Sequence, residues 1–237
     1  MSDVQVIILA AGKSSRLYPL TLNQPKSLLT FDAEPLLLRT VRQLHGIGMT
    51  SICIVVGHHQ QKIRDALQCF GDAIEFINNE HYENDTNVLS LYLALKKVKK
   101  NTLVIEADVV FSNTCWPVIK QACTSQSSIW FTQGKFLPHQ KGGIIKSDAQ
   151  RKITDMRIVP VFDSQYQAYS KNLGMVYISS NELSHYQAIL EAAVINSTAS
   201  YYMEYWIQHL SELNCEEINL FPHPAGSFNT LEELEYC

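Results

Sequence analysis

The sequence lacks any apolar stretch that approaches the roughly 20 residues needed to cross a membrane as a helix. It also lacks a leader segment: Met1-Ser2-Asp3 runs directly into a short apolar run, with no basic region and no cleavage site. These absences predict a soluble cytoplasmic protein with no membrane insertion.

Cysteine spacing of the metal-binding or redox kind is absent as well. None of the 6 cysteines forms a Cys-x-x-Cys pair, and no group of Cys and His residues has zinc-ligand spacing. In a chain of 237 residues these cysteines are expected to be reduced thiols. A structural zinc site and a disulfide framework are therefore not expected.

An excess of positive charge is the third absence. The chain has 19 Lys and Arg against 23 Asp and Glu, for a formal net charge of −4. Proteins that bind nucleic acid in general usually carry a basic footprint, so no nucleic-acid partner is expected. A local cationic pocket is still compatible with this balance, because a phosphate site needs only two or three positive groups. The composition is 46% hydrophobic, which is enough for a sizeable core.

The first half of the chain alternates predicted strands and helices. Continuous apolar runs predict buried strands, and apolar residues recurring at helical spacing predict helices between them. Repeated strand–helix–strand units favour a parallel sheet covered by helices on both faces, which is a three-layer α/β domain. The predicted strands span 4–10, 52–56, 74–77 and 103–111, and the predicted helices span 37–44, 63–70 and 88–98.

The second half is less regular, and no linker or internal repeat separates it from the first. A single domain over 1–237 is therefore expected, with halves 1–111 and 112–237. In the second half, strands are predicted at 142–146, 152–157, 173–178 and 217–221, helices at 182–194 and 201–213, and a short closing helix from Thr230.

Small residues follow the first predicted strand in an order suited to phosphate binding. After Leu9, the residues Ala10, Ala11 and Gly12 leave room for backbone N–H groups to close on a polyphosphate. Arg16 adds a bidentate donor and Lys26 a compact mobile charge. A turn with two solvated cations is the alternative. The order of strand, loop, Arg and Pro-Lys favours the phosphate site.

The stretch from Leu9 to Leu17, followed by Pro25-Lys26, resembles a family signature. The pattern Leu-Ala-Ala-Gly-x-Gly-x-Arg-Leu and then Pro-Lys is that of the nucleotidyltransferases that make nucleotide sugars and CDP-alcohols. The resemblance implies a three-layer α/β/α Rossmann-like fold with a mostly parallel mixed sheet. It also implies the reaction of an NTP with an R-phosphate to give NDP-R and pyrophosphate.

The same resemblance implies roles for single residues. Residues 9–12 would bind the nucleotide, Arg16 would hold the β- and γ-phosphates, and Lys26 the α-phosphate or the acceptor phosphate. Both Arg16 and Lys26 are thus predicted to be catalytic. Ser14 stands where the family often has its second Gly, and Ser tolerates positive φ less well than Gly.

Two further positions match the family's Mg²⁺ site. Asp108 is predicted at the carboxyl end of a buried strand, where open α/β sheets bind ligands, and Mg²⁺ needs only one or two protein oxygens besides phosphates. Asn229 precedes the last predicted helix, where the family has a second ligand. The alternatives are an Asp that opens a turn and an Asn that caps a helix beside Thr230.

Within the family, the chain most resembles the bacterial choline-phosphate cytidylyltransferases. The segment 87–93 is similar to their Asn-x-x-Ser-Leu-Tyr helix opening, and 202–206 to their acidic-x-Tyr-Trp segment. The resemblance implies CTP and phosphocholine as the substrate pair. It makes Asn87 and Ser90 candidate nucleotide contacts, with helix N-capping as the alternative.

A quaternary ammonium is best held by aromatic faces beside a carboxylate. Glu204, Tyr205 and Trp206 offer that combination, and Trp130 would add another wall. Aromatic residues at helical spacing are more often part of a core, so both interpretations stand. For an extra cation on the acceptor phosphate the candidates are Arg157 and Lys171, and sequence order does not choose between them.

Three alternatives to the CTP–phosphocholine pair remain at this stage. A sugar-1-phosphate nucleotidyltransferase would need polar acceptor contacts in place of the aromatic cage, and a cytidylyltransferase for another small phosphate or phosphonate shares the motifs loosely. A non-catalytic nucleotide-sensing module would be expected to have lost Arg16, Lys26 or Asp108, and all are present. In each case 1–111 would be the nucleotide-binding half, and in the enzymes 112–237 the acceptor-binding half.

Overall fold

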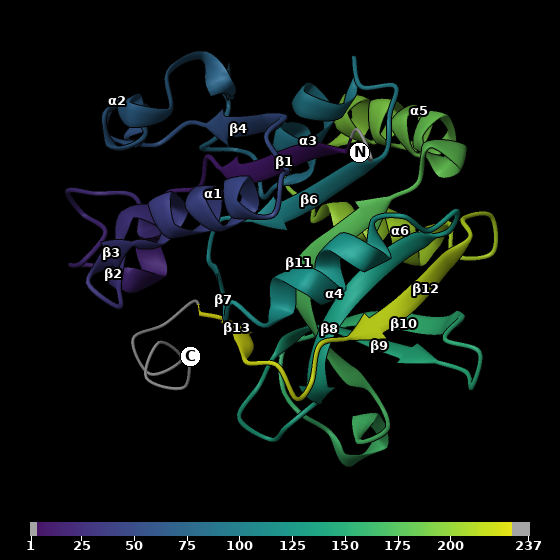
Figure 1. Cartoon of the computed structure of the whole chain (residues 1–237). Helices are drawn as coiled ribbons and strands as arrows, with labels where there is room; N and C mark the ends of the chain where they lie inside the picture. Colours follow the sequence, from purple (N-terminus) through teal and green to yellow (C-terminus); the bar gives the residue numbers. More distant parts are fainter. Residues whose placement is uncertain (1–3, 229–237) are drawn as a thin grey trace.

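The computed structural model describes residues 4–228, so the predicted ligand Asn229 and the closing helix from Thr230 lie outside the described residues. The first half of the chain forms four parallel strands in the order β6-β1-β4-β5. Helices connect them, as the periodicity predicted (Figure 1). The strands are β1 (Gln5–Ala10), β4 (Ile52–Val56), β5 (Ile74–Asn78) and β6 (Thr102–Glu106), and the helices are α1 (Leu36–Gly46), α2 (Gln60–Ala66) and α3 (Val88–Leu95).

The second half extends the same sheet. Strand β11 runs antiparallel to β6 and pairs in turn with β8 and β9, which makes the sheet mixed. Together the strands form a nine-stranded sheet. The added elements are α4 (Cys115–Ala122), β8 (Ser128–Lys135), β9 (Gly142–Ser147), β10 (Ile153–Val159), β11 (Ser170–Ile178), α5 (Ser180–Asn196), α6 (Tyr202–Gln208) and β12 (Cys215–Asn219).

Helices cover both faces of the sheet because its strands are apolar on both sides. Alternate β1 side chains enter two separate clusters: Val6 and Ile8 pack with α1 and α4, whereas Ile7 packs with α3, α5 and α6. This layering confirms the predicted three-layer Rossmann-like fold.

The remaining described elements are small. They are 3₁₀ turns at Ser15–Leu17, Lys26–Leu28, Gln68–Ala73 and Ser164–Tyr166, and the short strands β2 (Thr30–Phe31), β3 (Glu34–Pro35), β7 (Val109–Phe111) and β13 (Ala225–Ser227).

The predicted strand 103–111 is wrong as a single element. The chain leaves the sheet after Glu106, and Ala107 and Asp108 form a turn before β7 pairs with β13. The helix α3 ends at Leu95, three residues before the predicted end at 98. The sequence pattern also failed to predict α4 and β8. The helix α6 ends at Gln208, whereas the prediction extended this helix to residue 213.

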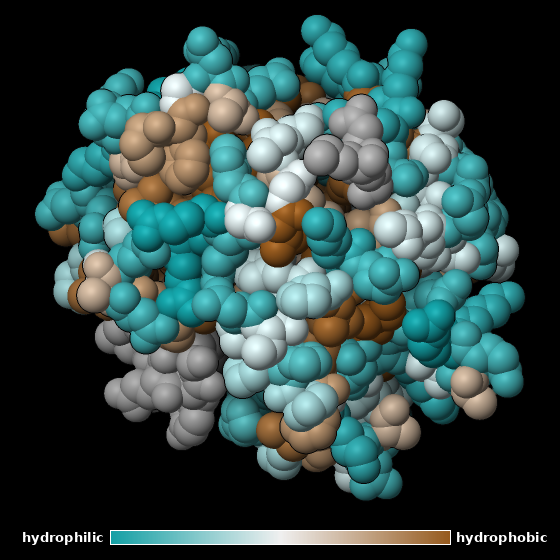
Figure 2. All heavy atoms as spheres, in the orientation of Figure 1, coloured by the Kyte–Doolittle hydropathy of each residue, from teal (hydrophilic) through white to brown (hydrophobic). Residues whose placement is uncertain are grey.

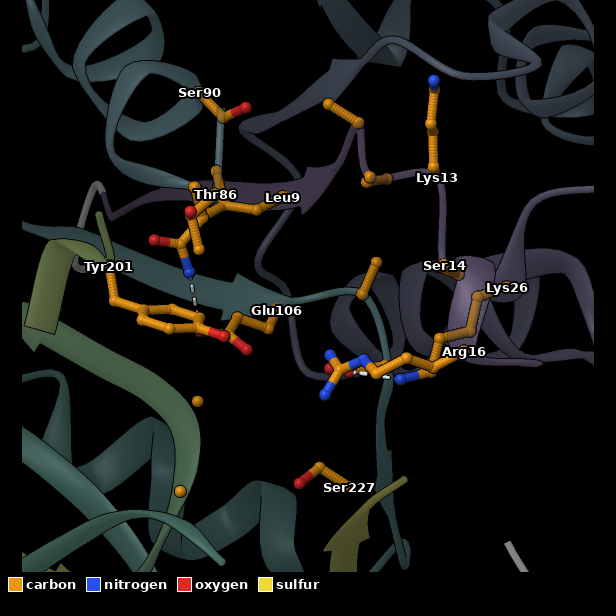
Figure 3. Close-up of a pocket in the computed structure, with 18 of the residues that line it drawn as sticks. Leu9, Lys13, Ser14, Arg16, Lys26, Thr86, Ser90, Glu106, Tyr201 and Ser227 are labelled. Carbon is orange, nitrogen blue, oxygen red and sulfur yellow. Dashed lines mark hydrogen bonds and ion pairs between the residues drawn. The ribbon is translucent and has the colours of Figure 1, made fainter. Parts of the chain in front are cut away.

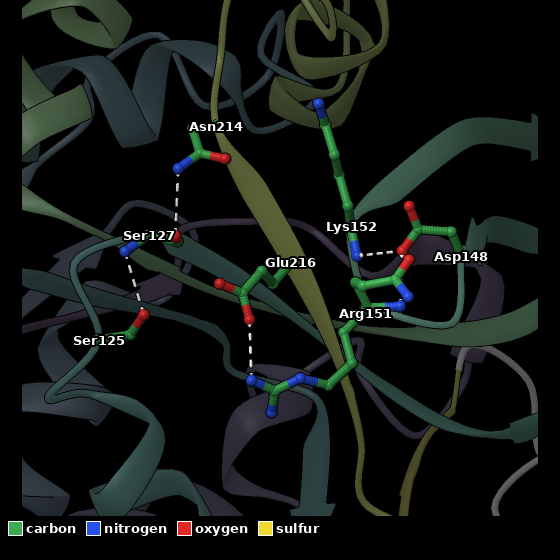
Figure 4. A network of polar contacts seen from close by, with 8 residues as sticks. Ser125, Ser127, Asp148, Arg151, Lys152, Asn214 and Glu216 are labelled. Atoms are coloured by element: carbon green, nitrogen blue, oxygen red, sulfur yellow. Dashed lines mark hydrogen bonds and ion pairs between the residues drawn. The ribbon is translucent and has the colours of Figure 1, made fainter.

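Polar contacts join β12 and the residue just before it to the segments that contain Arg151 and Ser127 (Figure 4). Arg151 Nη2 donates to Glu216 Oε2 at 3.0 Å, and Asn214 Nδ2 donates to Ser127 Oγ at 3.1 Å. The space-filling view shows a mostly hydrophilic face with separate hydrophobic patches (Figure 2). Within residues 4–228, none of the helices is both long and apolar enough to cross a membrane.

Candidate active site

A pocket of about 810 Å³ opens at the carboxyl ends of β1 and β6. This is the edge at which open α/β sheets bind ligands. Both halves of the chain line it (Figure 3). The pocket brings together these predicted residues: Leu9, Ala10, Ala11, Gly12, Arg16, Lys26, Asn87, Ser90 and Asp108.

Hydrogen bonds hold the small-residue loop after β1 in place. The Leu9 carbonyl accepts from Ala107 N at 3.1 Å, and the Ala11 carbonyl accepts from His58 N at 3.0 Å. Gly57 permits this close approach, because a Cβ there would lie 2.9 Å from the Ala11 oxygen. Around Gly12, by contrast, the space is open: an added Cβ would meet no atom within 4 Å. The backbone at Gly12 is therefore accessible to a ligand.

Ser14 adopts the left-handed conformation that the family's glycine would favour, with φ of +53°. Its carbonyl accepts a hydrogen bond from Thr21 Oγ1 at 2.8 Å, and Thr21 is completely buried. The loop thus keeps the left-handed backbone although a serine occupies this position.

Two cations reach the pocket from the segment that follows the loop. Arg16 belongs to the 3₁₀ turn Ser15–Leu17, and Lys26 to the 3₁₀ turn after Pro25. Lys26 is buried, and its Nζ lies 2.5 Å from Asp108 Oδ2 and 4.6 Å from the centre of the Phe228 ring. The ion pair joins residues 82 positions apart in the sequence. It therefore fixes the 3₁₀ turn Lys26–Leu28 against the turn after β6.

The second oxygen of Asp108 has a different environment. Asp108 Oδ1 is buried and has no hydrogen-bond partner among the described residues. A buried carboxylate oxygen without a partner is costly unless a cation or donor joins it. Within residues 4–228, no cluster of three or more His, Cys, Asp or Glu side chains is arranged to hold a metal alone. The donor set therefore fits an ion that brings phosphate oxygens with it.

Asn87 links three elements at the pocket. Its Oδ1 accepts from Tyr202 N at 2.9 Å, and its Nδ2 donates to Glu106 Oε1 at 3.3 Å. Asn87 makes no side-chain capping bond to α3. The capping is performed by Asp85, whose carboxylate accepts from the backbone N–H groups of Leu89 and Ser90. The alternative that Asn87 caps the helix is therefore wrong.

Glu106 is a pocket residue that the sequence prediction missed. It is the last residue of β6, and a carboxyl at the end of a buried apolar strand was a usable signal, since open α/β sheets bind ligands at this edge. Burial raises the pKa of Glu106 to about 8, and the charge of Asp108 adds to the rise, while the Tyr202 hydroxyl, Lys26 and Lys171 oppose it.

Gly174 of β11 gives the Glu106 carboxyl its space. A Cβ at Gly174 would lie 2.9 Å from Glu106 Oε2, and Gly174 has φ of +71°. We expect Gly174→Ala to lower the free energy of unfolding by about 1–3 kcal/mol, from the left-handed backbone and the displaced carboxyl. Gly46→Ala, at an open helical position, should be neutral or slightly stabilising. Urea unfolding measures both variants, and equal stabilities would contradict this role of Gly174.

The predicted aromatic cage is wrong in its composition. Trp130 and Trp206 are fully buried in the core, where their rings pack edge to face at 5.8 Å, and neither lines the pocket. Glu204 accepts from Tyr201 N at 2.9 Å and so closes a capping box, while the Tyr205 hydroxyl contacts Ser200 Oγ at 2.9 Å. The helical spacing of these aromatics marked the core-facing side of α6. The pocket is lined instead by Tyr82, Tyr201 and Tyr202.

The structure also separates the two candidates for an acceptor-side cation. Lys171 lines the pocket, and its Nζ donates to the Asn172 carbonyl at 3.1 Å. Arg157 does not line it, because its side chain turns to Asp155, with Nε 2.7 Å from Oδ2. Lys171 is therefore the cation placed to meet an acceptor. Lys141 also lines this end of the pocket, and the sequence prediction missed it.

Comparison with known proteins places this pocket in a family. Residues 6–157, more than half of the chain, match the MobA-like NTP transferase domain. The chain belongs to this family. The matched region contains the loop after β1, the pocket cations Arg16 and Lys26, and Asp108.

The relatives agree with that placement. The chain is 32% identical over 138 residues to the choline-phosphate cytidylyltransferase of Streptococcus pneumoniae, covering 54% of this chain and 58% of that protein. It is 27% identical over 154 residues to the CMP-5'-(3-aminopropyl)phosphonate synthase of Streptomyces rubellomurinus, covering 64% of this chain and 24% of that protein. The matched parts thus span less than two thirds of these relatives' own lengths.

A solved structure of the Streptococcus pneumoniae CTP:phosphocholine cytidylyltransferase has the same fold. Its TM-score is 0.84 with 21% identity, over 99% of this chain and 97% of that one. The match covers both halves of the sheet, including the part beyond residue 157.

Proposed function

We propose that this protein is a Mg²⁺-dependent nucleotidyltransferase that uses CTP and a small phosphorylated acceptor, with phosphocholine as the leading candidate. The observation that carries the proposal is the Lys26–Asp108 pair, which lies in one pocket with Arg16 and the open loop at Gly12. Two cations, a carboxylate and an accessible backbone together match the needs of a triphosphate and its divalent ion.

In the proposed reaction, an oxygen of the acceptor phosphate attacks the α-phosphorus of CTP. A new P–O bond forms there as the bond to the β-phosphate oxygen breaks, and pyrophosphate leaves. The attacking phosphate is already an anion at pH 7, so the reaction needs no general base. The protein's contribution is to position the reactants and to neutralise charge, with Arg16 on the departing phosphates and Lys26 on the α-phosphate or the acceptor phosphate.

Asp108 is the proposed protein ligand of Mg²⁺. Its partnerless Oδ1 supports this assignment, and Lys26 already neutralises part of its charge through Oδ2. When bound, Mg²⁺ would supply electrostatic neutralisation of the phosphate oxygens. Asn229, proposed as a second ligand, lies outside the described residues.

Two observations support a nitrogen-containing acceptor such as phosphocholine. Both curated relatives described above are named for acceptors that contain an amine or quaternary nitrogen, phosphocholine and 3-aminopropylphosphonate. The pocket carries lysines at its second-half end, Lys141 and Lys171, which suit the phosphate of such a molecule. The aromatic ring available to the head at the start of α6 is that of Tyr201, in place of the predicted tryptophans, whereas Tyr202 is almost completely buried and stacks on Trp130.

A substrate panel tests the proposal. The purified protein would be incubated with Mg²⁺ and CTP, UTP or dTTP, each with phosphocholine, 2-aminoethylphosphonate or glucose-1-phosphate, and pyrophosphate release would be measured. We expect release to require CTP, a nitrogen-containing acceptor and Mg²⁺, and to stop when EDTA is added. Release only with glucose-1-phosphate would favour a sugar nucleotidyltransferase. Nucleotide binding without release for any acceptor would favour a nucleotide-sensing module.

A further inference from the structure

The chemistry proposed above leaves one pocket carboxyl without a task. Glu106 lies on the pocket floor at the end of β6, next to Leu9 in the register of the sheet. It is partly accessible, and Asn87 Nδ2 is its hydrogen-bond donor at 3.3 Å. Its other side faces the backbone of β11 at Gly174, which has no side chain to cover it. Glu106 thus sits where the two halves of the chain meet.

A positive group lies at the same end of the pocket. Lys171 Nζ is held near the carbonyls of Asn172 and Gly143, at 3.1 and 3.4 Å. Lys171 belongs to β11, the same strand as Gly174, which faces the Glu106 carboxyl, and all three residues line the pocket. This end of the pocket therefore offers one cation and one carboxyl to a bound molecule. Such a pair is complementary to a ligand that carries an anion and a cation.

The walls next to Glu106 suit an organic cation better than a polar sugar. They are formed by consecutive residues at the start of α6, namely Tyr201, Tyr202 and Met203. Aromatic faces beside a carboxylate are the environment that binds an ammonium group. Figure 3 shows Tyr201 and Glu106 close together near Leu9, with Arg16 and Lys26 on the other side of the cavity.

We propose that Glu106 is a specificity-determining residue that selects zwitterionic acceptors, with its carboxylate facing the acceptor's cationic head and Lys171 facing its phosphate. The inference rests on the proposed function, because it assigns a role at the acceptor end of that same site. The position also gives Asn87 a positioning role, since Asn87 holds the Glu106 carboxyl toward the pocket.

Matched acceptors isolate the charge of the head. Phosphocholine would be compared with 3,3-dimethylbutyl phosphate, and 2-aminoethylphosphonate with propylphosphonate, because each pair differs mainly in whether nitrogen or carbon occupies the head. We expect the wild type to prefer the charged member of each pair that it accepts. In Glu106→Gln this preference, as a ratio of kcat/KM values, should fall by about 10–100-fold, mainly through KM. Glu106→Asp, which keeps the charge, should retain part of it.

Glu204→Gln is the matched control, since that carboxylate caps α6 outside the pocket and its loss should leave the preference unchanged. Calorimetric binding of each acceptor, with Mg²⁺ and a non-hydrolysable CTP analogue present, gives a readout that does not need turnover. Weaker phosphocholine binding in Glu106→Gln without turnover in the wild type would support this inference and contradict the proposed function. An unchanged preference in an active Glu106→Gln, or a wild type that prefers the neutral isosteres, would overturn the inference alone.

Discussion

Lys26→Ala should lower the rate of product formation by about 10²–10³-fold, the usual effect of removing one charge-stabilising group from such a site. The structure explains why this lysine matters more than an exposed one. Its ammonium group is buried between Asp108 and the Phe228 ring, so it presents a fixed charge in a poorly solvated place. There an electrostatic contact to a phosphate is stronger than in water. Steady-state pyrophosphate release measures the loss.

The substitution also removes a buried ion-pair partner, so stability has to be measured separately. Leaving Asp108 without Lys26 is expected to destabilise the protein. Lys26→Met leaves Asp108 unpaired as well, but it keeps the aliphatic stem and so avoids the additional loss of packing. Lys96→Ala, at an exposed lysine just after α3, is the control and should retain full activity. If folded Lys26→Met kept full turnover, the phosphate role of Lys26 would be refuted.

Asp108→Asn should have the second large effect, and the dependence of its reaction rate on Mg²⁺ concentration identifies the cause. An amide keeps the shape of the side chain but removes the charge that a hard cation prefers. We expect a loss of about 10²–10³-fold at moderate Mg²⁺, with the half-saturating Mg²⁺ concentration shifted upward. A Mg²⁺ titration of the initial rate at saturating CTP measures both.

Asp72→Asn provides the comparison, because that exposed carboxylate lies outside the pocket. It should leave both the rate and the Mg²⁺ midpoint unchanged. A midpoint that also stays fixed in Asp108→Asn, with only the maximal rate reduced, would mean that Asp108 acts by holding Lys26. Such a result would remove the proposed metal role.

The first half of the chain was the more predictable part of the molecule. Strands such as Ile52–Val56 are continuous apolar runs, and their parallel order follows from the short helical connections. The phosphate loop and Asp108 follow strand ends, so a local pattern was enough to place them at one sheet edge. The turn at Asp108 was missed because the apolar run continues through it into β7.

The second half of the chain was less predictable because its pocket residues come from distant segments. Lys141 and Lys171 reach the pocket through antiparallel pairings whose register does not appear in any local pattern. The aromatic cage predicted from the residues of α6 was wrong for a different reason. A stripe at helical spacing marks a buried face, and Trp206 lies on that face, whereas the pocket is met by the first residues of the helix.

Arg16, Lys26 and Asp108 are proposed to bind one triphosphate and its ion. A crystal structure of the protein with Mg²⁺ and CTP, without acceptor, tests it most directly. We predict the triphosphate over the loop at Gly12, within hydrogen-bonding distance of Arg16 and Lys26, and the ion on an oxygen of Asp108. A nucleotide bound elsewhere, or an ion in the pocket that does not contact Asp108, would contradict the claim.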